Sequence, residues 1–424
     1  MSKGRGPAAK AGLAKALLLG LALAMMTTAC SAPPETGPPT VLHVMMTDDW
    51  VTPPFVDAVR TFERTHSRVR IEVEKVSIRQ MSEAVKSKID RGDPPDVVQA
   101  HAFSAAAERL AEQITDLWNR RLKPAEYLPG AVEDVTWDGE RFGVPLDTNA
   151  LVLMFNADHF TAANIQPPGE ATTFADLERM AKALSRPDGS QRALVFPTSN
   201  WWTYGWIRAN GGEVVETGPD GEASLTLDAP KVVETVRFLA GLVQRGYAFA
   251  PRAVTSHSGD ALALFRSGNA SMHASGSWDL ATLAREDPSG RYRPALLPKG
   301  TAGGAPGSVL GGSSLYVGKG SGHRTLAFEF MLHLTSDQYA LRFAREQGRL
   351  PARRRVFDDA YFQTPELQVF VRQLESAHAF RLEAFPQARQ AFETALDEAL
   401  RLGRDPAEAL HRAQEMAGAA RPQP

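Results

Sequence analysis

The sequence predicts an α/β protein with two lobes, on the evidence of its element order and its length. Between residues 41 and 100, apolar runs typical of strands alternate with amphipathic helical patterns in the order β-α-β-α-β. Such alternation is typical of a largely parallel sheet covered by helices. The 424 residues, of which 43% are hydrophobic and 23% charged, are enough for two globular lobes.

The elements of the first lobe follow from the spacing of apolar residues. Met81, Val85 and Ile89 recur every four residues, as on one face of a helix. The predicted elements are a strand at 41–46, a helix at 54–65, a strand at 71–76, a helix from Met81 to near Gly92, and a strand at 96–100. Folds of this kind bind ligands at the loops that leave the carboxyl ends of the strands.

A second set of elements begins after the Trp-Asp-Gly sequence at 137–139. Residues 142–156 read as one long extended stretch, and we place a crossing between the lobes near Asp147. Thr173 is suited to cap a helix, and Pro230 is suited to begin another that ends at Gly246. Further strands are predicted at 270–274, 293–297 and 315–317, and helical periodicity dominates from residue 324 to the end.

The N-terminus has the pattern of a secretory signal peptide, predicted to span residues 1–29. Basic residues without any acid precede an apolar run at 16–26. This run is too short for a transmembrane helix, which needs roughly 20 apolar residues. The sequence therefore predicts export.

The only cysteine, Cys30, directly follows this segment. Thr28, Ala29 and Cys30 resemble a bacterial lipobox, in which the peptidase cuts before the cysteine and its thiol takes a diacylglycerol. Thr27 departs from the lipobox pattern, which prefers Leu there. The proline-rich segment 30–39 is then predicted to be a lipidated tether to the membrane. Ordinary secretion with an incidental cysteine is the alternative.

Composition and motifs argue against several classes of function. A formal net charge of −2 gives no basic footprint for nucleic acid. The common metalloprotease, hydrolase and P-loop patterns are absent from the sequence, and its histidines lack metal-ligand spacing. We therefore expect no enzymatic activity, no metal and no cofactor.

Eight short segments in order carry a resemblance to a known family. They are 95–98 (PDVV), 137–139 (WDG), 142–145 (FGVP), 155–156 (FN), 167–168 (PP), 209–212 (ANGG), 265–268 (FRSG) with 276–278 (GSW), and 348–351 (GRLP). Over residues 40–417 the sequence resembles the solute-binding lipoproteins of ATP-driven importers, the large group typified by maltose-binding protein.

The resemblance implies a two-lobed periplasmic-binding-protein fold of type II, with hinge crossings and a ligand cleft between the lobes that closes on the solute. It places lobe 1 at 40–146 and 305–350, and lobe 2 at 148–299 and 352–424. It also implies a monomer that serves the permease subunits of an ABC importer, held by its lipid in the periplasm or on the outer cell surface.

Candidate ligand-binding residues come from strand ends and from matches to the family. Flat aromatic rings stack on the apolar face of a sugar, and carboxylates accept hydrogen bonds from its hydroxyls. The candidates are Asp49 and Trp50 after the first strand, His101 after the third, Asp147 at the hinge, Trp201 and Tyr204 before the glycine turn, Ser277 and Trp278 after Gly276, and Ser313.

Structural roles are the alternatives for several of these candidates. Asp49 is placed to favour a helix N-terminus, and Asp147 is placed for a hinge hydrogen bond. The expected function is capture of a sugar or oligosaccharide for import. The alternatives are a non-sugar polar solute such as a polyol or a glycerol phosphate derivative, a glycoside hydrolase that uses Asp49 and Asp147, and an envelope scaffold.

Overall fold

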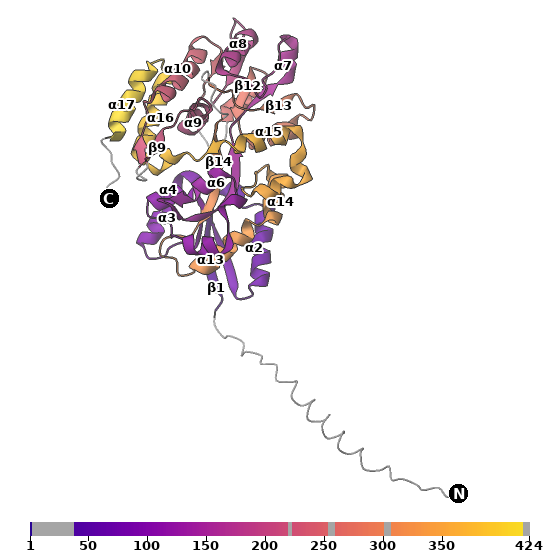
Figure 1. Ribbon diagram of the computed structural model, residues 1–424, viewed down its shortest axis with the longest axis vertical. Helices are drawn as coiled ribbons and strands as arrows, with labels where there is room; N and C mark the ends of the chain where they lie inside the picture. Colours follow the sequence, from indigo (N-terminus) through magenta and orange to yellow (C-terminus); the bar gives the residue numbers. More distant parts are fainter. Residues whose placement is uncertain (2–37, 219–222, 253–258, 301–306, 419–424) are drawn as a thin grey trace. The chain divides into compact units, whose positions relative to one another are not determined.

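Two mixed β-sheets flanked by helices form the scaffold of the protein in the computed structural model (Figure 1). The structure describes residues 1, 38–218, 223–252, 259–300 and 307–418. The predicted signal peptide beyond Met1, Cys30 and most of the predicted tether lie outside the described residues. Contacts between Cα atoms group the chain from Val41 onward into one unit.

The first sheet runs in the order β15-β14-β3-β1-β2, and β6 also pairs with β14. Its strands are β1 (Thr40–Met46), β2 (Val69–Lys75), β3 (Val97–Ala100), β6 (Gly143–Ala150), β14 (Ser308–Tyr316) and β15 (Ala377–His378). β1 and β3 are parallel, whereas β14 runs antiparallel to both β3 and β6. The expected parallel arrangement is thus confirmed for β1 and β3, whereas the sheet as a whole is mixed. The chain leaves this sheet along β6 and returns along β14, so these two strands have opposite directions.

The second sheet runs in the order β11-β8-β12-β7-β13. Its strands are β7 (Val152–Asn156), β8 (Arg192–Val195), β11 (Ala248–Phe249), β12 (Ala270–Ser275) and β13 (Tyr292–Ala295). β8 is parallel to β11 and β12, and β7 is antiparallel to β12 and β13. β6 and β7 are separated only by Leu151, so the predicted extended stretch links the two sheets directly.

Helices cover both sheets. The helices that precede β7, together with the first two that follow β14, are α2 (Pro53–Thr65), α3 (Met81–Asp90), α4 (Ala102–Ala107), α5 (Thr115–Arg121), α6 (Pro129–Asp134), α13 (Arg324–Leu334) and α14 (Asp337–Gln347). The others are α7 (Ala157–Ala162), α8 (Phe174–Leu184), α9 (Asn200–Ala209), α10 (Pro230–Gln244), α11 (Gly259–Arg266), α12 (Ser277–Glu286), α15 (Pro365–Leu374), α16 (Pro386–Leu400) and α17 (Pro406–Gly418). α10, α16 and α17 lie side by side, and α2 packs on α13 and α14 (Figure 1).

Short elements complete the described chain. They are the hairpin β4 (Thr136–Trp137) and β5 (Glu140–Arg141), the hairpin β9 (Val215–Thr217) and β10 (Ala223–Leu225), and single 3-10 turns that include η1 (Asp48–Trp50) and η6 (Arg381–Ala384). Within the described ranges, no helix has the length and apolar character needed to cross a membrane.

Local sequence signals set several helix ends as predicted. Thr173 caps α8 in a capping box: its Oγ1 accepts from the Asp176 amide at 3.2 Å, and its own amide donates to the Asp176 carboxylate at 2.8 Å. Pro230 begins α10, and the chain leaves that helix through Gly246, whose φ of +74° suits glycine.

Two apolar clusters form the core. One contains the strands β1, β3 and β14 with the helices around them, and the other contains α8, α9, α10, α16 and α17. Residues 352–377, which the predicted boundaries assign to lobe 2, contribute Val356, Phe362 and Phe370 to the first cluster. The chain joins the second cluster again at Phe380. The lobe boundaries stay a prediction.

Candidate functional site

A chain of hydrogen bonds joins the end of β1 to the strand that links the sheets. The Thr47 amide donates to the Gln99 Oε1 at 2.9 Å, and the Gln99 Nε2 donates to the Ser313 Oγ at 3.1 Å. The Thr47 hydroxyl lies 3.0 Å from the same Gln99 oxygen and donates to Asp49 Oδ1 at 2.6 Å. Ser313 in turn donates to Asp147 Oδ1 at 2.9 Å. With the exception of Asp49, these side chains are buried, so the bonds fix Asp147 against β14.

Arg349 completes this group. Its Nη2 donates to Asp49 Oδ2 at 2.6 Å, its Nη1 lies 3.6 Å from Asp147 Oδ2, and its guanidinium carbon lies 4.1 Å from the centroid of the Trp50 ring. We call this group the Asp147 cluster, defined as Thr47, Asp49, Gln99, Asp147, Ser313 and Arg349. The Gly-Arg-Leu-Pro segment at 348–351 carries part of the family resemblance, but nothing in the sequence predicts a role for Arg349.

The two carboxyl groups of the Asp147 cluster differ electrostatically. Burial raises the pKa of Asp147 to about 6, although Arg349 and the Ser313 hydroxyl act in the opposite direction. Burial also acts to raise the pKa of Asp49, but the Thr47 hydrogen bond and the Arg349 charge outweigh it and leave that pKa below its ordinary value. Asp49 is therefore ionised at neutral pH, whereas Asp147 titrates close to neutral pH.

Trp50 contributes little open surface. It is 1% exposed, its ring meets Phe343 edge to face at 4.9 Å, and Arg349 covers it. A stacking role for Trp50 stays a prediction that requires Arg349 to move.

Trp201 and Trp278 form a second group. Their rings are partly exposed, with centroids 6.2 Å apart and planes inclined at 45°. Trp201 lies at the start of α9 and donates its Nε1 to the Leu310 carbonyl of β14 at 3.3 Å, whereas the Trp278 Nε1 has no hydrogen-bond partner among the described residues. We call these two rings the indole pair.

Asn149 and Ser277 connect the two groups. The Asn149 Nδ2 donates to the Ser277 Oγ at 3.2 Å, and the Ser277 amide donates back to the Asn149 Oδ1 at 3.2 Å. Ser277 also donates to the carbonyl of Gly348 at 2.8 Å, the residue before Arg349. The structure thus brings Ser277, beside Trp278, close to the Asp147 cluster. Asn149 was not among the predicted residues, and only its position two residues after Asp147 on the linking strand pointed to it.

His101 bonds to none of these groups and lies in a network of ion pairs of its own, although the charge of Asp147 also acts on it. Its Nδ1 lies 2.6 Å from Asp134 Oδ1, and its Nε2 lies 3.6 Å from Glu383 Oε2. Burial acts to lower the pKa of His101, but the two carboxylates outweigh it and raise that pKa to about 10. The imidazole is therefore charged at neutral pH.

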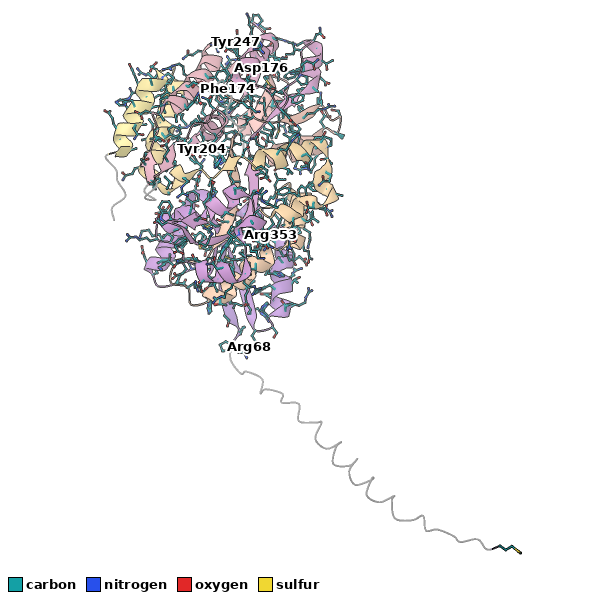
Figure 2. All side chains as sticks on the ribbon, in the orientation of Figure 1. Arg68, Phe174, Asp176, Tyr204, Tyr247 and Arg353 are labelled. Carbon is teal, nitrogen blue, oxygen red and sulfur yellow. The ribbon has the colours of Figure 1, made fainter. Side chains whose placement is uncertain are left out.

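Tyr204 is also held inside the protein. It is 1% exposed, and its hydroxyl donates to the Glu213 carboxylate at 2.9 Å. The same carboxylate accepts a hydrogen bond from Arg208 at 2.8 Å. Figure 2 labels Tyr204 within the body of the molecule. Trp202 and Trp206 of the same helix are core residues, 5% and 0% exposed. The predicted site residues therefore form two sets, and two residues lie outside them. One set is Asp49, Trp50, Asp147 and Ser313, and a second is Trp201, Ser277 and Trp278. His101 and Tyr204 belong to neither set.

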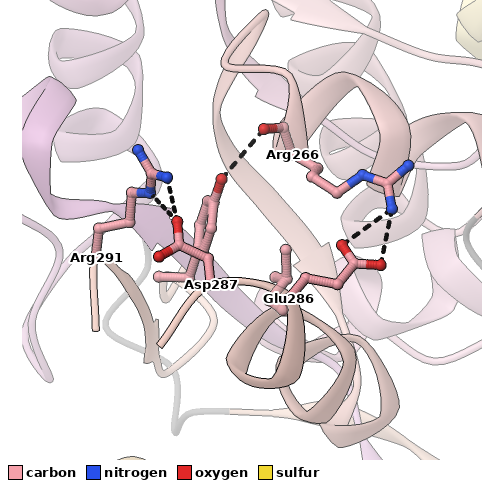
Figure 3. Close-up of a pocket in the computed structure, with 6 residues that line it drawn as sticks. Arg266, Glu286, Asp287 and Arg291 are labelled. Atoms are coloured by element: carbon pink, nitrogen blue, oxygen red, sulfur yellow. Dashed lines mark hydrogen bonds and ion pairs between the residues drawn. The ribbon is translucent and has the colours of Figure 1, made fainter. Parts of the chain in front are cut away.

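Two surface hollows lie elsewhere. One, of about 300 Å³, is lined by Arg266, Leu283, Glu286, Asp287, Arg291 and Tyr292 (Figure 3). Its arginines already pair with acids within the hollow, Arg266 with Glu286 and Arg291 with Asp287. The other hollow lies beside α8. Over the described parts of the chain, His, Cys, Asp and Glu side chains form no group that could hold a metal ion.

Comparisons with known proteins fit this arrangement. The family model for the bacterial extracellular solute-binding protein matches residues 57–369. The diacetylchitobiose binding protein DasA of Streptomyces coelicolor is 24% identical over 317 residues, which are 72% of this chain and 70% of DasA. The sn-glycerol-3-phosphate-binding periplasmic protein UgpB of Rhizobium meliloti is 24% identical over 357 residues, which are 77% of this chain and 80% of UgpB.

The fold has solved counterparts. The structure of the sugar-binding protein MalE from Xanthomonas citri matches with a TM-score of 0.77 at 19% identity, over 89% of this chain and 97% of MalE. This likeness confirms the predicted two-lobed α/β fold of periplasmic binding proteins. The family match covers well over half of the chain and confirms the predicted resemblance. The chain belongs to the bacterial extracellular solute-binding protein family.

Proposed function

We propose that this protein is the solute-binding component of an ATP-driven importer, and that its solute is a carbohydrate captured at the indole pair and the Asp147 cluster. The observation that carries the proposal is the indole pair itself, two partly exposed rings 6.2 Å apart. An indole face packs well on the C–H face of a pyranose ring. Aromatic rings beside a few fixed polar groups are typical of small-molecule binding sites.

Polar groups that suit sugar hydroxyls lie next to the indole pair. Asn149 and Ser277 bond each other beside Trp278, and their amide and hydroxyl groups are of the kind that bind sugar hydroxyls. Ionised Asp49 only accepts hydrogen bonds, as a hydroxyl-rich ligand requires. The relatives DasA and MalE are a diacetylchitobiose binding protein and a sugar-binding protein, which supports the same class of solute.

The charge of the Asp147 cluster favours a neutral sugar over a phosphate ester, the solute named for UgpB. Arg349 is the cation of this cluster, and it already pairs with Asp49 and lies near Asp147. With both carboxyl groups ionised, the cluster carries a net negative charge. A phosphate would meet this charge unless Arg349 left its partners.

Hydrolysis is the less favoured role for the same residues. A retaining or inverting glycosidase needs one protonated and one ionised carboxyl group placed on either side of the scissile bond. Here both carboxyl groups face the same guanidinium, and the relatives described above are binding proteins.

The remaining parts of the proposal concern delivery. A lipid on Cys30 and the proline-rich tether would hold the protein at a membrane next to its permease. The lipid, the permease and a monomeric state are supported by the sequence pattern and by the family, whose members act outside the cytoplasm.

Titration of the full chain tests the solute class. Tryptophan fluorescence is recorded with N,N′-diacetylchitobiose, maltose, glycerol and sn-glycerol 3-phosphate. The proposal expects a saturable change with a sugar that chromatography then recovers intact. Cleavage of the sugar would overturn the binding role, a response to glycerol or sn-glycerol 3-phosphate alone would overturn the solute class, and no response to any probe would overturn the proposal.

A further inference from the structure

Trp137 stands out among the tryptophans. All seven tryptophans of the chain lie in described residues, and Trp137 is the one that neither belongs to nor packs against either apolar cluster. It is nevertheless only partly exposed. A large ring with this placement does not serve the core, so its position needs another explanation.

A tight hairpin fixes the Trp137 backbone. Trp137 pairs with Glu140 across β4 and β5, and the two turn residues Asp138 and Gly139 have φ values of +48° and +78°. Two consecutive positive φ values are typical of the two-residue turn that best fits a hairpin. The ring is therefore presented from a rigid support.

Two other side chains complete a surface around the Trp137 ring. The Phe385 ring lies 6.3 Å from it, centroid to centroid, and the Arg381 guanidinium carbon lies 5.5 Å from its centroid. Phe385 is partly exposed, and the Arg381 Nε has no hydrogen-bond partner among the described residues. We call these three residues the Trp137 platform.

A polar rim adjoins the platform. α4 packs on both β4 and η6, which places His101 and Glu383 beside these elements. The Glu383 carboxylate lies 3.6 Å from the His101 Nε2 and is 28% exposed, and the Ser104 hydroxyl donates to the Glu383 carbonyl at 3.3 Å. Glu383 can accept a bond from a ligand hydroxyl while it keeps His101 as its partner.

The platform continues the candidate site along one edge of the first sheet. β1 and β3 are parallel, so Thr47 and His101, the residues that directly follow them, lie at the same carboxyl edge. Gln99 of β3 belongs to the Asp147 cluster and is two residues from His101. Aromatic and polar groups thus follow one another from the Asp147 cluster to the Trp137 platform.

We propose that the Trp137 platform is a second sugar-binding subsite, so that the solute is an oligosaccharide long enough to reach beyond the Asp147 cluster. This inference rests on the proposed carbohydrate function and names the length class of its solute. The platform offers two rings for stacking and an arginine donor, and its rim offers a carboxylate acceptor, which is the combination that a sugar unit uses.

The test measures affinity as a function of chain length. Dissociation constants of the full chain are measured by calorimetry for maltose through maltopentaose and for N,N′-diacetylchitobiose through its pentasaccharide homologue. In the series that binds, we expect affinity to rise about tenfold at the length that reaches the platform, as an added stacking contact would give. Trp137→Ala should remove this rise and leave disaccharide affinity unchanged, and Trp137→Phe should restore part of it.

Tyr247 provides a matched control. It is also a partly exposed ring beside an arginine, with the Arg245 guanidinium carbon 5.6 Å from its centroid, and Figure 2 labels it at the upper end of the molecule. Tyr247→Ala should change no dissociation constant in the series. Two results would overturn the second subsite and leave the proposed function standing. One is disaccharide binding with no increase in affinity for longer sugars. The other is an increase in affinity that remains in the Trp137→Ala variant. Binding of no member of either series would overturn both.

Discussion

The guanidinium of Arg349 lies 4.1 Å from the ring of Trp50 and at the same time donates to Asp49 at 2.6 Å. Residues 300 positions apart in the sequence are thereby locked together at the end of β1. Because Asp147 lies 3.6 Å from the other terminal nitrogen of the same guanidinium, a change at Arg349 affects both carboxyl groups.

Arg349→Ala should lower the free energy of unfolding. The substitution leaves Asp147 buried without its cation and uncovers Trp50, and we expect a loss of about 2 kcal/mol in urea unfolding at neutral pH. Arg266→Ala is the matched control, since Arg266 forms a half-exposed pair with Glu286 and should cost less than about 1 kcal/mol. Equal losses in the two variants would contradict the role given to Arg349.

Asp147 should make the protein less stable as the pH rises. Its pKa is raised to about 6 in the folded protein and is about 3.9 when unfolded, so the folded state binds the extra proton between these values. The penalty of ionising Asp147 is therefore absent at low pH and complete above pH 6. Asp147→Asn should gain stability relative to the wild type across this range, by roughly 1 to 3 kcal/mol at pH 7.5. A difference in unfolding free energy that stays constant with pH would refute this.

His101 should show the opposite dependence. Its pKa is raised to about 10, so the stabilisation from Asp134 and Glu383 is complete below the unfolded pKa of about 6.5 and is lost as the pH rises towards 10. Since His101 is 25% exposed, solvent screens part of this effect, and we expect His101→Gln to cost roughly 2 kcal/mol at pH 6. The cost should shrink by pH 9.5, and a cost unchanged by pH would point to packing alone.

Trp278→Ala should weaken binding of the sugar that the wild type binds. Loss of one ring of the indole pair is expected to cost roughly 1 to 3 kcal/mol in calorimetric titration. Trp278→Phe keeps an aromatic face and should lose less. Full affinity in a folded Trp278→Ala protein would remove this ring from the site.

Cys30→Ser should release the protein from the membrane without stopping its export. The prediction depends on the thiol as the only point of lipid attachment. Cells that produce each form are fractionated, and the share of the protein in the membrane fraction is measured, with the wild-type chain as the control. A Cys30→Ser protein that stays in the membrane fraction would refute lipid attachment at this residue.

Elements with strong local signals could be predicted from the sequence. The helix α8 has a capping box at Thr173 and one buried face, and the apolar run at β1 has few other interpretations. The helix α9 was not predicted, because Trp202 to Ile207 are buried on all sides and such a helix shows no amphipathic period. β14 was expected only at its end, since Gly311 and Gly312 interrupt the pattern of a strand.

Some of the site residues could be predicted from local sequence signals, and others could not. Strand ends and family motifs placed Asp49, Asp147 and Trp278 in groups that the structure brings together. Tyr204 matched its motif equally well, yet its ring is buried and its hydroxyl bonds Glu213. Arg349 lies in a family motif and Asn149 lies two residues after Asp147, but neither signal gave a role, because the roles come from partners that are distant in the sequence.

The solute site at the strand ends stays a prediction, whereas the family and the α/β fold could be read from the sequence alone. These depend on short-range patterns and on motifs that are read residue by residue. The three-dimensional arrangement of the chain sets which charged side chains neutralise one another and which side chains stay open. That choice depends on the antiparallel return of β14 beside β6 and on contacts across some 200 or more positions, such as Arg349 with Asp49 and Arg349 with Asp147. Charge, burial and pKa are set by these contacts and not by the identity of any single residue.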